Sequence, residues 1–420
     1  MGSVHLRLSV MMFLQYAIWG AWLPFAYRFF TQHRGIEGSE VGQLLSVAAS
    51  GALIAPFLFG QIADRWIATE KLLALCHGVG ALLVWQLARL TDVHQLMLFA
   101  FLYSLIYTPT ISLTNSLALT HITDRDRQFG RVRVWGTIGW ICAGIGVSQW
   151  LSYAHSPEGM PEVVAQAELA GLADSFRLSA ILGIALGAFC WAGLPSTPPR
   201  PGSSRFAPFE ALSVLKKRRM WALFLIAFPI ACIHQFYFVH TELFLNTLRI
   251  NDTPTLRAIF GAGGGGLMTV GQMSEIIVLA ALSNIIQRTA RKVLLGIGLL
   301  AYILRFASFA YLQSSTAAII SAIALHGLCF GCFIFVAYMI VDEESAPTVK
   351  ASAQALFNFI VIGLGTIVGS RFAGEVSKIC ALESGTNYQL LYAIPMYVAL
   401  TCLVLLMLLY PDGRSATARS

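Results

Sequence analysis

The feature that most constrains this chain is a series of apolar blocks of about 20 residues that recurs along its whole length. A block of that length can cross a bilayer as a helix and is too long for a strand of a membrane barrel. Of the 420 residues, 57% are hydrophobic and only 12% are charged, whereas a typical soluble domain has about 25% charged residues. The sequence therefore predicts an all-α integral membrane protein.

Twelve transmembrane helices are expected, arranged as two six-helix bundles. They lie near residues 8–30, 41–63, 71–91, 95–119, 130–153, 174–194, 220–246, 266–287, 292–312, 315–341, 350–377 and 386–410. A stretch rich in proline, serine and basic residues follows the sixth span and is typical of a linker. The predicted domains are an N-terminal bundle (1–194), a cytoplasmic linker (195–219) and a C-terminal bundle (220–420).

The net charge of +7 raises the question of nucleic-acid binding, but the positions of the basic residues exclude it. They gather in loops on one side of the predicted membrane, and the loop before the sixth span is acidic instead. The basic set is Arg65, Lys71, Arg125, Arg127, Lys216, Lys217, Arg218, Arg219, Arg288, Arg291 and Lys292, and the acidic set is Glu158, Glu162, Glu168 and Asp174. The positive-inside rule then predicts a multi-pass protein of the bacterial inner membrane with both termini in the cytoplasm.

The predicted loop between the second and third spans contains the run GQIADRW. Two six-helix halves joined by a basic loop resemble the major facilitator superfamily, and Gly60, Asp64 and Arg65 have the spacing of that superfamily's G-x-x-x-D-R gating motif. A small glycine lets helices approach, and the aspartate caps or pairs with a neighbouring helix end. An ordinary capped turn is the alternative.

Glu275 lies near the middle of the predicted eighth span, within GQMSEIIVLA. A charge at the bilayer centre costs about 2.5–3.5 kcal/mol on insertion scales, so it usually faces a cavity. Gln272 is three residues earlier and shares a helix face with Glu275. We interpret the pair as substrate contacts with one titratable proton site. The alternative is a structural glutamate paired with a cation of a neighbouring helix.

Arg133, Thr137 and Trp140 form one stripe along the predicted fifth span. A guanidinium, a hydroxyl and an indole suit a neutral, polyhydroxylated ligand with an aromatic ring, because the ring can stack on the indole while hydroxyls meet the polar groups. The alternative is that Arg133 extends to the interface and Trp140 packs on lipid.

Two further spans carry candidate ligands. In span seven the candidate is Gln235, within IHQFYFVH, whose aromatic residues are equally explained as core. In span ten His326 and Phe330 are four residues apart and share a face, although a lone intramembrane histidine is more often structural. Cys329 and Cys332 form a single CxxC in an apolar helix without a second pair, so we expect no metal or cofactor.

At these residues the chain resembles the bacterial nucleoside:proton symporters of the major facilitator superfamily. The likeness extends nearly from end to end and is most specific in RVWGTIGW and in the Gln-x-x-Glu of span eight. The resemblance implies a substrate cavity near the bilayer midplane with alternating access. By position, its cavity residues fall on Arg133, Thr137, Trp140, Gln235, Gln272, Glu275, His326 and Phe330. It further implies that Glu275, Arg133 and His326 take part in proton coupling, with Glu275 as the proton-linked carboxylate and Arg133 as its charged partner.

Three positions depart from the family pattern. This chain has His326 where the family has tyrosine, Gly331 where it has aspartate and Phe238 where it has asparagine. These changes alter two or three polar contacts and leave the base preference open. His326 has an unperturbed pKa near 6.5 and could compensate for the missing aspartate.

The function predicted from the sequence is inward nucleoside transport by proton symport, by a monomer without catalytic residues. Transport of another small polar solute, such as a sugar or a nucleoside-derived metabolite, is the alternative. A non-transporting membrane sensor is disfavoured because the chain has no long soluble domain. An intramembrane enzyme would need a second deep carboxylate or a Ser/His/Asp set, which the spans lack.

Overall fold

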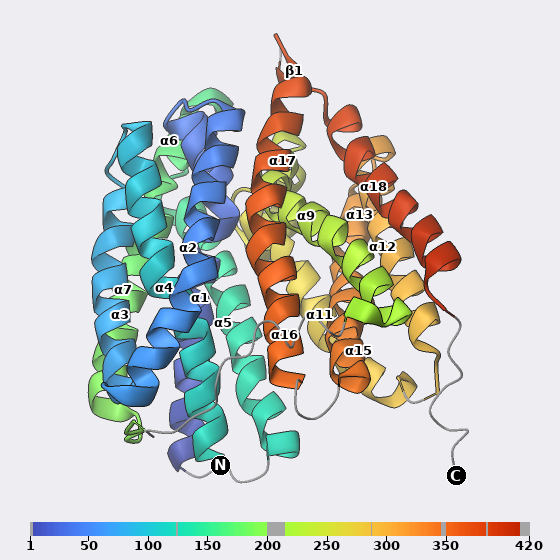
Figure 1. The fold of residues 1–420 in the computed structure, drawn as a ribbon. Coiled ribbons are helices and arrows are strands. Elements are labelled where there is room, and N and C mark those ends of the chain that lie inside the picture. The colour runs from blue at the N-terminus through green and yellow to red at the C-terminus, as the bar shows by residue number, and fades with distance from the viewer. Residues whose placement is uncertain are drawn as a thin grey trace. The chain divides into compact units, whose positions relative to one another are not determined.

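The computed structural model describes residues 3–122, 125–199, 215–286, 288–345, 350–383 and 385–411, and nearly all of these are helical (Figure 1). The first part of the chain forms α1 (Ser3–Arg28), which continues as the π-helical turn η1 (Phe29–His33), and then six further helices. These are α2 (Gly38–Arg65), α3 (Thr69–Leu87), α4 (Val93–His121), α5 (Arg125–Ala154), α6 (Pro161–Gly171) and α7 (Ala173–Gly193).

The second part begins with α9 (Arg218–Thr247), followed by the short η3 (Ile250–Asp252) and α10 (Pro254–Phe260). The long helices α11 (Gly265–Ile285) and α12 (Arg291–Tyr311) come next. A continuous helical stretch then consists of α13 (Thr316–Ala324), α14 (His326–Leu328), the π-helical η4 (Cys329–Phe335) and α15 (Val336–Glu344). The last elements are α16 (Lys350–Asn358), η5 (Phe359–Leu364), α17 (Gly365–Ile379), the hairpin of β1 (Ala381–Leu382) and β2 (Gly385–Thr386), and α18 (Tyr388–Leu409).

Each of the twelve predicted spans coincides with one long helix or one continuous run of helical segments, so the all-α membrane class is confirmed. Within the described residues, nine helices are long and apolar enough to cross a membrane. The remaining three predicted spans correspond to α2, α3 and α5. A total of twelve crossings therefore stays a prediction for those three helices.

Polar side chains fix where several helices begin. Asp92 accepts a hydrogen bond from the backbone N–H of Gln95 at the start of α4, over 2.9 Å. Asn387 does the same for Leu390 at the start of α18, over 3.0 Å. Such caps satisfy backbone donors that have no partner inside the helix.

The chain divides into two compact units. Unit 1 contains Met1–Ser204 together with Phe238–Thr269, and unit 2 contains Arg205–Tyr237 together with Val270–Ser420. The predicted linker 195–219 lies mostly outside the described residues. By contacts, the second part of α9, the following loop and the start of α11 belong with the first six spans, although the sequence places them in the C-terminal bundle.

In unit 1, α1 packs against α5 and α7, and α4 packs against α2 and α3. The contact between α1 and α5 depends on Gly139, because a Cβ atom there would lie 2.1 Å from the backbone oxygen of Phe13. Close approach through a glycine is a common way to pack membrane helices. The close contact at Gly139 therefore determines which face of α5 packs against α1.

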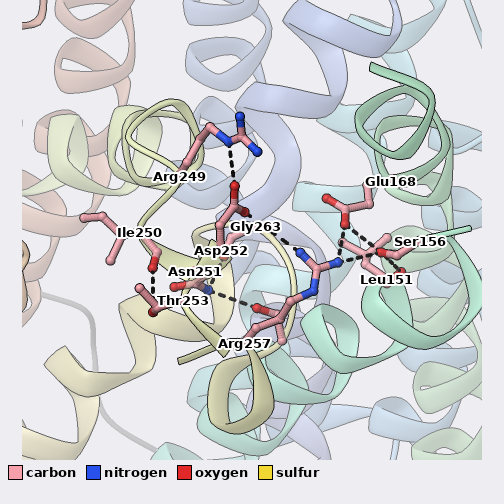
Figure 2. A network of polar contacts seen from close by, with 11 residues as sticks. Leu151, Ser156, Glu168, Arg249, Ile250, Asn251, Asp252, Thr253, Arg257 and Gly263 are labelled. Carbon is pink, nitrogen blue, oxygen red and sulfur yellow. Dashed lines mark hydrogen bonds and ion pairs between the residues drawn. The ribbon is translucent and has the colours of Figure 1, made fainter. Parts of the chain in front are cut away.

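A polar network holds the segment 248–264 to the rest of unit 1 (Figure 2). The Arg257 guanidinium donates to Glu168 of α6 over 2.6 Å and to Ser156 over 2.8 Å. Arg249 pairs with Asp252 inside the segment, over 2.5 Å, and Asp252 also lies 4.0 Å from Arg257. Arg257 is thus the cation of this network that ties α10 to α6.

Candidate functional site

The stripe predicted on α5 has a defined setting in unit 1. The Cζ atom of Arg133 lies 4.0 Å from the ring centroid of Tyr16 on α1, which is a cation–π contact. Gly136 makes this possible, because a Cβ atom there would come within 2.6 Å of the Tyr16 ring. Arg133 is thus held by an aromatic ring of the neighbouring helix, and Thr137 is half-buried one turn further along α5.

Trp140 belongs to an aromatic cluster rather than standing alone. Its ring is 5.7 Å from Trp19 and 6.1 Å from Phe238, both edge to face, and Trp19 in turn contacts Tyr107 at 6.3 Å. Phe238 is one of the three departures from the family pattern, and it extends the aromatic surface instead of supplying an amide. Trp140 itself remains half-buried.

In unit 2, α11 presents Gln272 and Glu275. Gln272 is buried, and its side-chain oxygen has no hydrogen-bond partner among the described residues. The Oε2 atom of Glu275 lies 3.8 Å from Nε2 of His326, and the two side chains are 15% and 2% exposed. Two of the predicted residues, Glu275 and His326, are therefore brought together.

A tight contact between α11 and α14 sets this geometry. The Ser274 hydroxyl donates to the backbone oxygen of Ala324 over 2.6 Å and accepts from the N–H of Gly327 over 3.0 Å. A Cβ atom at Gly327 would lie 2.6 Å from the backbone of Ser274. Glu275 directly follows Ser274 and His326 directly precedes Gly327, so both lie beside this contact between the helices.

The remaining predicted ligands of unit 2 lie on α9 and η4. The Gln235 amide donates to Ser370 of α17 over 3.2 Å. Phe330 is half-buried within the π-helical η4, and π-helical turns are frequent at functional sites. Gly331 is buried beside Val278, whose Cγ1 would lie 2.8 Å from an added Cβ, so the aspartate of the family pattern would require Val278 to move.

The predicted gating motif needs a correction. The run GQIADR was expected in a loop, but α2 continues to Arg65, so these residues form its last two turns. Their backbone remains helical because the N–H of Trp66 still bonds to Ile62. Gly60 has open space around it and Arg65 is exposed, whereas the side chain of Asp64 is outside the described part of the structure.

Sequence reasoning missed Arg305 of α12. Its side chain is fully buried, and its Nη1 donates to Nδ1 of His326 over 3.1 Å. The sequence signal was present, because an arginine in the middle of the apolar run AYILRFASFAY is as unusual as Glu275. Unit 2 therefore holds a chain of three ionisable groups, from Glu275 through His326 to Arg305.

The described residues contain no cluster of metal-binding side chains. Unit 1 presents a guanidinium, a hydroxyl and aromatic rings, and unit 2 presents amides, an imidazole and a partly exposed carboxylate. Such groups can form hydrogen bonds, and the aromatic rings can stack.

The chain matches a family model described as Nucleoside H+ symporter over residues 2–414. The putative nucleoside transporter YegT of Escherichia coli (strain K12) is 30% identical over 394 residues, which cover 91% of this chain and 86% of YegT. The nucleoside permease NupG of the same organism is 26% identical over 412 residues, with 93% and 92% of the two chains covered.

The crystal structure of the nucleoside transporter NupG has the same fold. It superposes with a TM-score of 0.83 at 24% identity and covers 98% of this chain and 100% of the other. The expected major facilitator fold is thereby confirmed.

Proposed function

The chain belongs to the nucleoside:H+ symporter family, and we propose that protonation of Glu275 couples inward nucleoside movement to the proton gradient. Membership makes the protein a secondary active transporter that imports nucleosides with protons, and not an enzyme. The observation that carries the proposal is the 3.8 Å approach of the Glu275 carboxylate to the buried His326 ring. This carboxylate is 15% exposed, so a proton can reach it.

We assign substrate contacts within each unit, by the positions that the family pattern marks. Trp140 and its aromatic neighbours would stack on the base, while Arg133 and Thr137 of α5 would meet the ribose hydroxyls. Gln272 supports this assignment, because its side-chain oxygen is buried without a hydrogen-bond partner among the described residues. Gln235, His326 and Phe330 complete the set.

The coupling step follows from the cost of a buried charge. In this proposal the ionised Glu275 carboxylate attracts Arg133, which is its charged partner in the family pattern, and accepts hydrogen bonds from the donors beside it. A proton from outside neutralises the carboxylate and frees those donors for the nucleoside. The neutral, loaded carrier can then pass through a closed intermediate, whereas an unpaired charge resists moving into a dry environment. Release of the proton inside resets the carrier.

The finer features of the location are also part of the proposal. We expect a monomer in the bacterial inner membrane with both termini in the cytoplasm, and Gly60, Asp64 and Arg65 at a cytoplasmic gate. The basic residues between the spans support the orientation. Reporter fusions at each terminus test it, because a reporter that folds only outside the cytoplasm is expected to stay inactive at both ends.

Uptake into proteoliposomes tests the function. We expect an inward proton gradient to stimulate uptake of at least one labelled nucleoside among uridine, cytidine, adenosine, inosine, guanosine, thymidine and xanthosine. Glu275→Gln should lose accumulation against a gradient while retaining nucleoside exchange, because the amide cannot release a proton. Glu383→Gln neutralises an exposed carboxylate on the β1–β2 turn and serves as the matched control. Gradient-driven accumulation by Glu275→Gln at the level of the control would overturn the role of Glu275.

A further inference from the structure

Arg305 is a full positive charge enclosed in the helical core of unit 2. Its side chain is 0% exposed, and its guanidinium carbon lies 4.2 Å from the ring centroid of Tyr237, 4.9 Å from Tyr302 and 5.1 Å from Phe306. Three aromatic faces partly replace the water that the cation has lost. A charge held this deeply in a membrane helix is expected to have a functional partner.

That partner is His326, and the hydrogen bond between them has only one chemically allowed direction. Arginine has N–H donors and no acceptor, so its Nη1 can only donate to Nδ1 of His326, over 3.1 Å. Nδ1 must then present its lone pair. A neutral imidazole with an unprotonated Nδ1 carries its proton on Nε2.

The Nε2 atom is the one directed at Glu275, 3.8 Å from Oε2. This separation is longer than a hydrogen bond, so His326 donates to the carboxylate only when the glutamate side chain approaches the ring. The contact between α11 and α14 at Ser274 and Gly327 keeps the two backbones in place. Arg305, His326 and Glu275 thus form a directed chain of donors that ends on the carboxylate.

Apart from Glu275, whose ionised carboxylate would attract a protonated ring, the groups facing His326 do not favour a second positive charge beside Arg305. On α9, His234 stacks on it at 5.2 Å and Tyr237 at 5.3 Å, and His234 is bonded to the Tyr302 hydroxyl over 2.6 Å. The titratable groups in contact with the ring are His234 and Tyr237 of α9, Glu275 of α11 and Arg305 of α12, while α13 contributes none. Tyr302 of α12 and Cys329 of η4 lie one layer further out, beside Arg305. Within this set Glu275 supplies the one carboxylate, and Arg305 already supplies a permanent cation in direct contact.

We propose that Arg305 is a positioning residue that keeps His326 neutral with its proton on Nε2, so that Glu275 takes up the coupling proton. The inference rests on the proposed role of Glu275 and deepens it. His326 then donates to the ionised carboxylate and releases it when Glu275 is protonated. In this proposal His326 orients the carboxylate through a hydrogen bond and does not itself carry a coupling proton.

The protonation state and tautomer of the His326 ring can be measured directly by nitrogen NMR of ¹⁵N-histidine-labelled protein in lipid nanodiscs. The His326 signals are identified by their loss in His326→Gln. Between pH 5 and 8 (about the range in which a histidine ordinarily titrates), we expect the wild-type ring to stay neutral with the proton on Nε2. A ring that titrates in this range, or that carries its proton on Nδ1, would overturn the proposal without any variant of Arg305.

Variants of Arg305 test whether this residue is what keeps the His326 ring neutral. Arg305→Gln keeps a donor and removes the charge, so the His326 ring should begin to titrate and the pH midpoint of proton-driven uptake should shift by about one pH unit. Arg305→Lys keeps the charge and should retain the wild-type profile, and adding His326→Gln to Arg305→Gln should abolish the shift. The proposal would be overturned if, in monodisperse Arg305→Gln, the His326 ring still did not titrate and the pH dependence of proton-driven uptake equalled that of the wild type.

The NMR signal is independent of transport, which separates the two proposals. Proton-driven accumulation by Glu275→Gln would disprove the coupling role of Glu275 and, with it, that of Arg305. A titrating wild-type His326 together with loss of accumulation in Glu275→Gln would remove only the inference on Arg305.

Discussion

At the scale of single residues, unit 2 contains polar atoms that are buried without a hydrogen-bond partner in the described structure. They include Oε1 of Gln272 and both Nε and Nη2 of Arg305. Each such atom costs about 1–3 kcal/mol of stability. Atoms of this kind are expected where a ligand completes the hydrogen bonding. The cation–π contacts of Arg305 offset part of its cost, whereas Gln272 has no comparable compensation.

Gln272→Leu is therefore expected to change function and stability in opposite directions. Removing the amide should raise the KM for nucleoside uptake by about tenfold, the equivalent of one good hydrogen bond. The same change should leave the melting temperature unchanged or higher, since leucine removes an unsatisfied buried group of similar size. Uptake kinetics and thermal unfolding in detergent check both effects.

Gln313→Leu is the control for this variant, because Gln313 bonds to the backbone of Ala310 over 3.2 Å in a half-buried turn. Its KM should equal that of the wild type. If Gln272→Leu kept the wild-type KM, Gln272 would not contact the substrate.

The sequence could identify charged and polar residues inside the membrane but not the direction in which they point. Glu275 and Gln272 were found because their burial is expensive, and the same reasoning applied to Arg305 would have found it too. Its pairing with His326 could not be predicted, because it depends on how α12 packs beside α14. Likewise, the contact of Arg133 with Tyr16 depends on two glycines of α5 that bring α1 close.

At the scale of helices, the position of Glu275 depends on how closely α11 and α14 approach. The Ser274 hydroxyl bridges the two helices through Ala324 and Gly327. A hydroxyl that both donates and accepts across a helix pair holds the relative register of the two helices, and interhelical bonds of this kind are worth about 0.6–2 kcal/mol in membranes. This contact is the structural basis of the Glu275–His326 pair.

Gly327→Ala tests that contact. The added methyl carbon would lie 2.6 Å from the Ser274 backbone, so the helices must separate, at a cost of about 1–3 kcal/mol. We expect a lower melting temperature and loss of proton-driven accumulation, measured on the same preparation.

Gly146→Ala on α5 is the matched control for Gly327→Ala. This glycine is exposed and has nothing within 4 Å of an added Cβ. Alanine also has the higher helix propensity by about 1 kcal/mol, so the control should be neutral or slightly stabilising. Equal melting temperatures for the two variants would show that the α11–α14 contact tolerates expansion.

Helix positions were the most predictable part of the fold, because a span of apolar residues must satisfy its backbone within itself. The details inside the helices were not predictable. The tenth and eleventh spans contain the π-helical segments η4 and η5, which no hydrophobic pattern encodes. GQIADR was assigned to the loop after the second span by the spacing of its gating motif, yet a helix end at the membrane surface accepts these polar residues equally well.

At the scale of the whole molecule, contacts and sequence order divide the chain differently. Residues 238–269 join unit 1 by their contacts, but they are continuous with the parts of α9 and α11 that belong to unit 2. Alternating access requires one bundle to move against the other. Within unit 1 this segment is held by polar contacts that include the buried ion pair between Arg28 and Glu242, at 3.2 Å, and the network of Arg257.

Arg257→Gln is expected to loosen the segment without unfolding the protein. The Arg257–Glu168 pair is partly exposed, at 30% and 9%, and such a pair contributes about 1 kcal/mol, or about a fivefold change in a conformational equilibrium. Spin labels at the exposed positions Val163 of α6 and Ile259 of α10 report the change. The distance distribution should gain a longer component in Arg257→Gln, and the charge reversal Glu168→Arg with Arg257→Glu should remove it again.

Arg249→Gln supplies the control, because Arg249 pairs with Asp252 inside the same loop and does not reach α6 (Figure 2). Both variants remove one positive charge from the same surface, so a general electrostatic effect would change both distributions equally. A longer component confined to Arg257→Gln would mean that this ion pair biases the conformational equilibrium. Identical distributions in the two variants would mean that the segment stays bound through its backbone and apolar contacts alone.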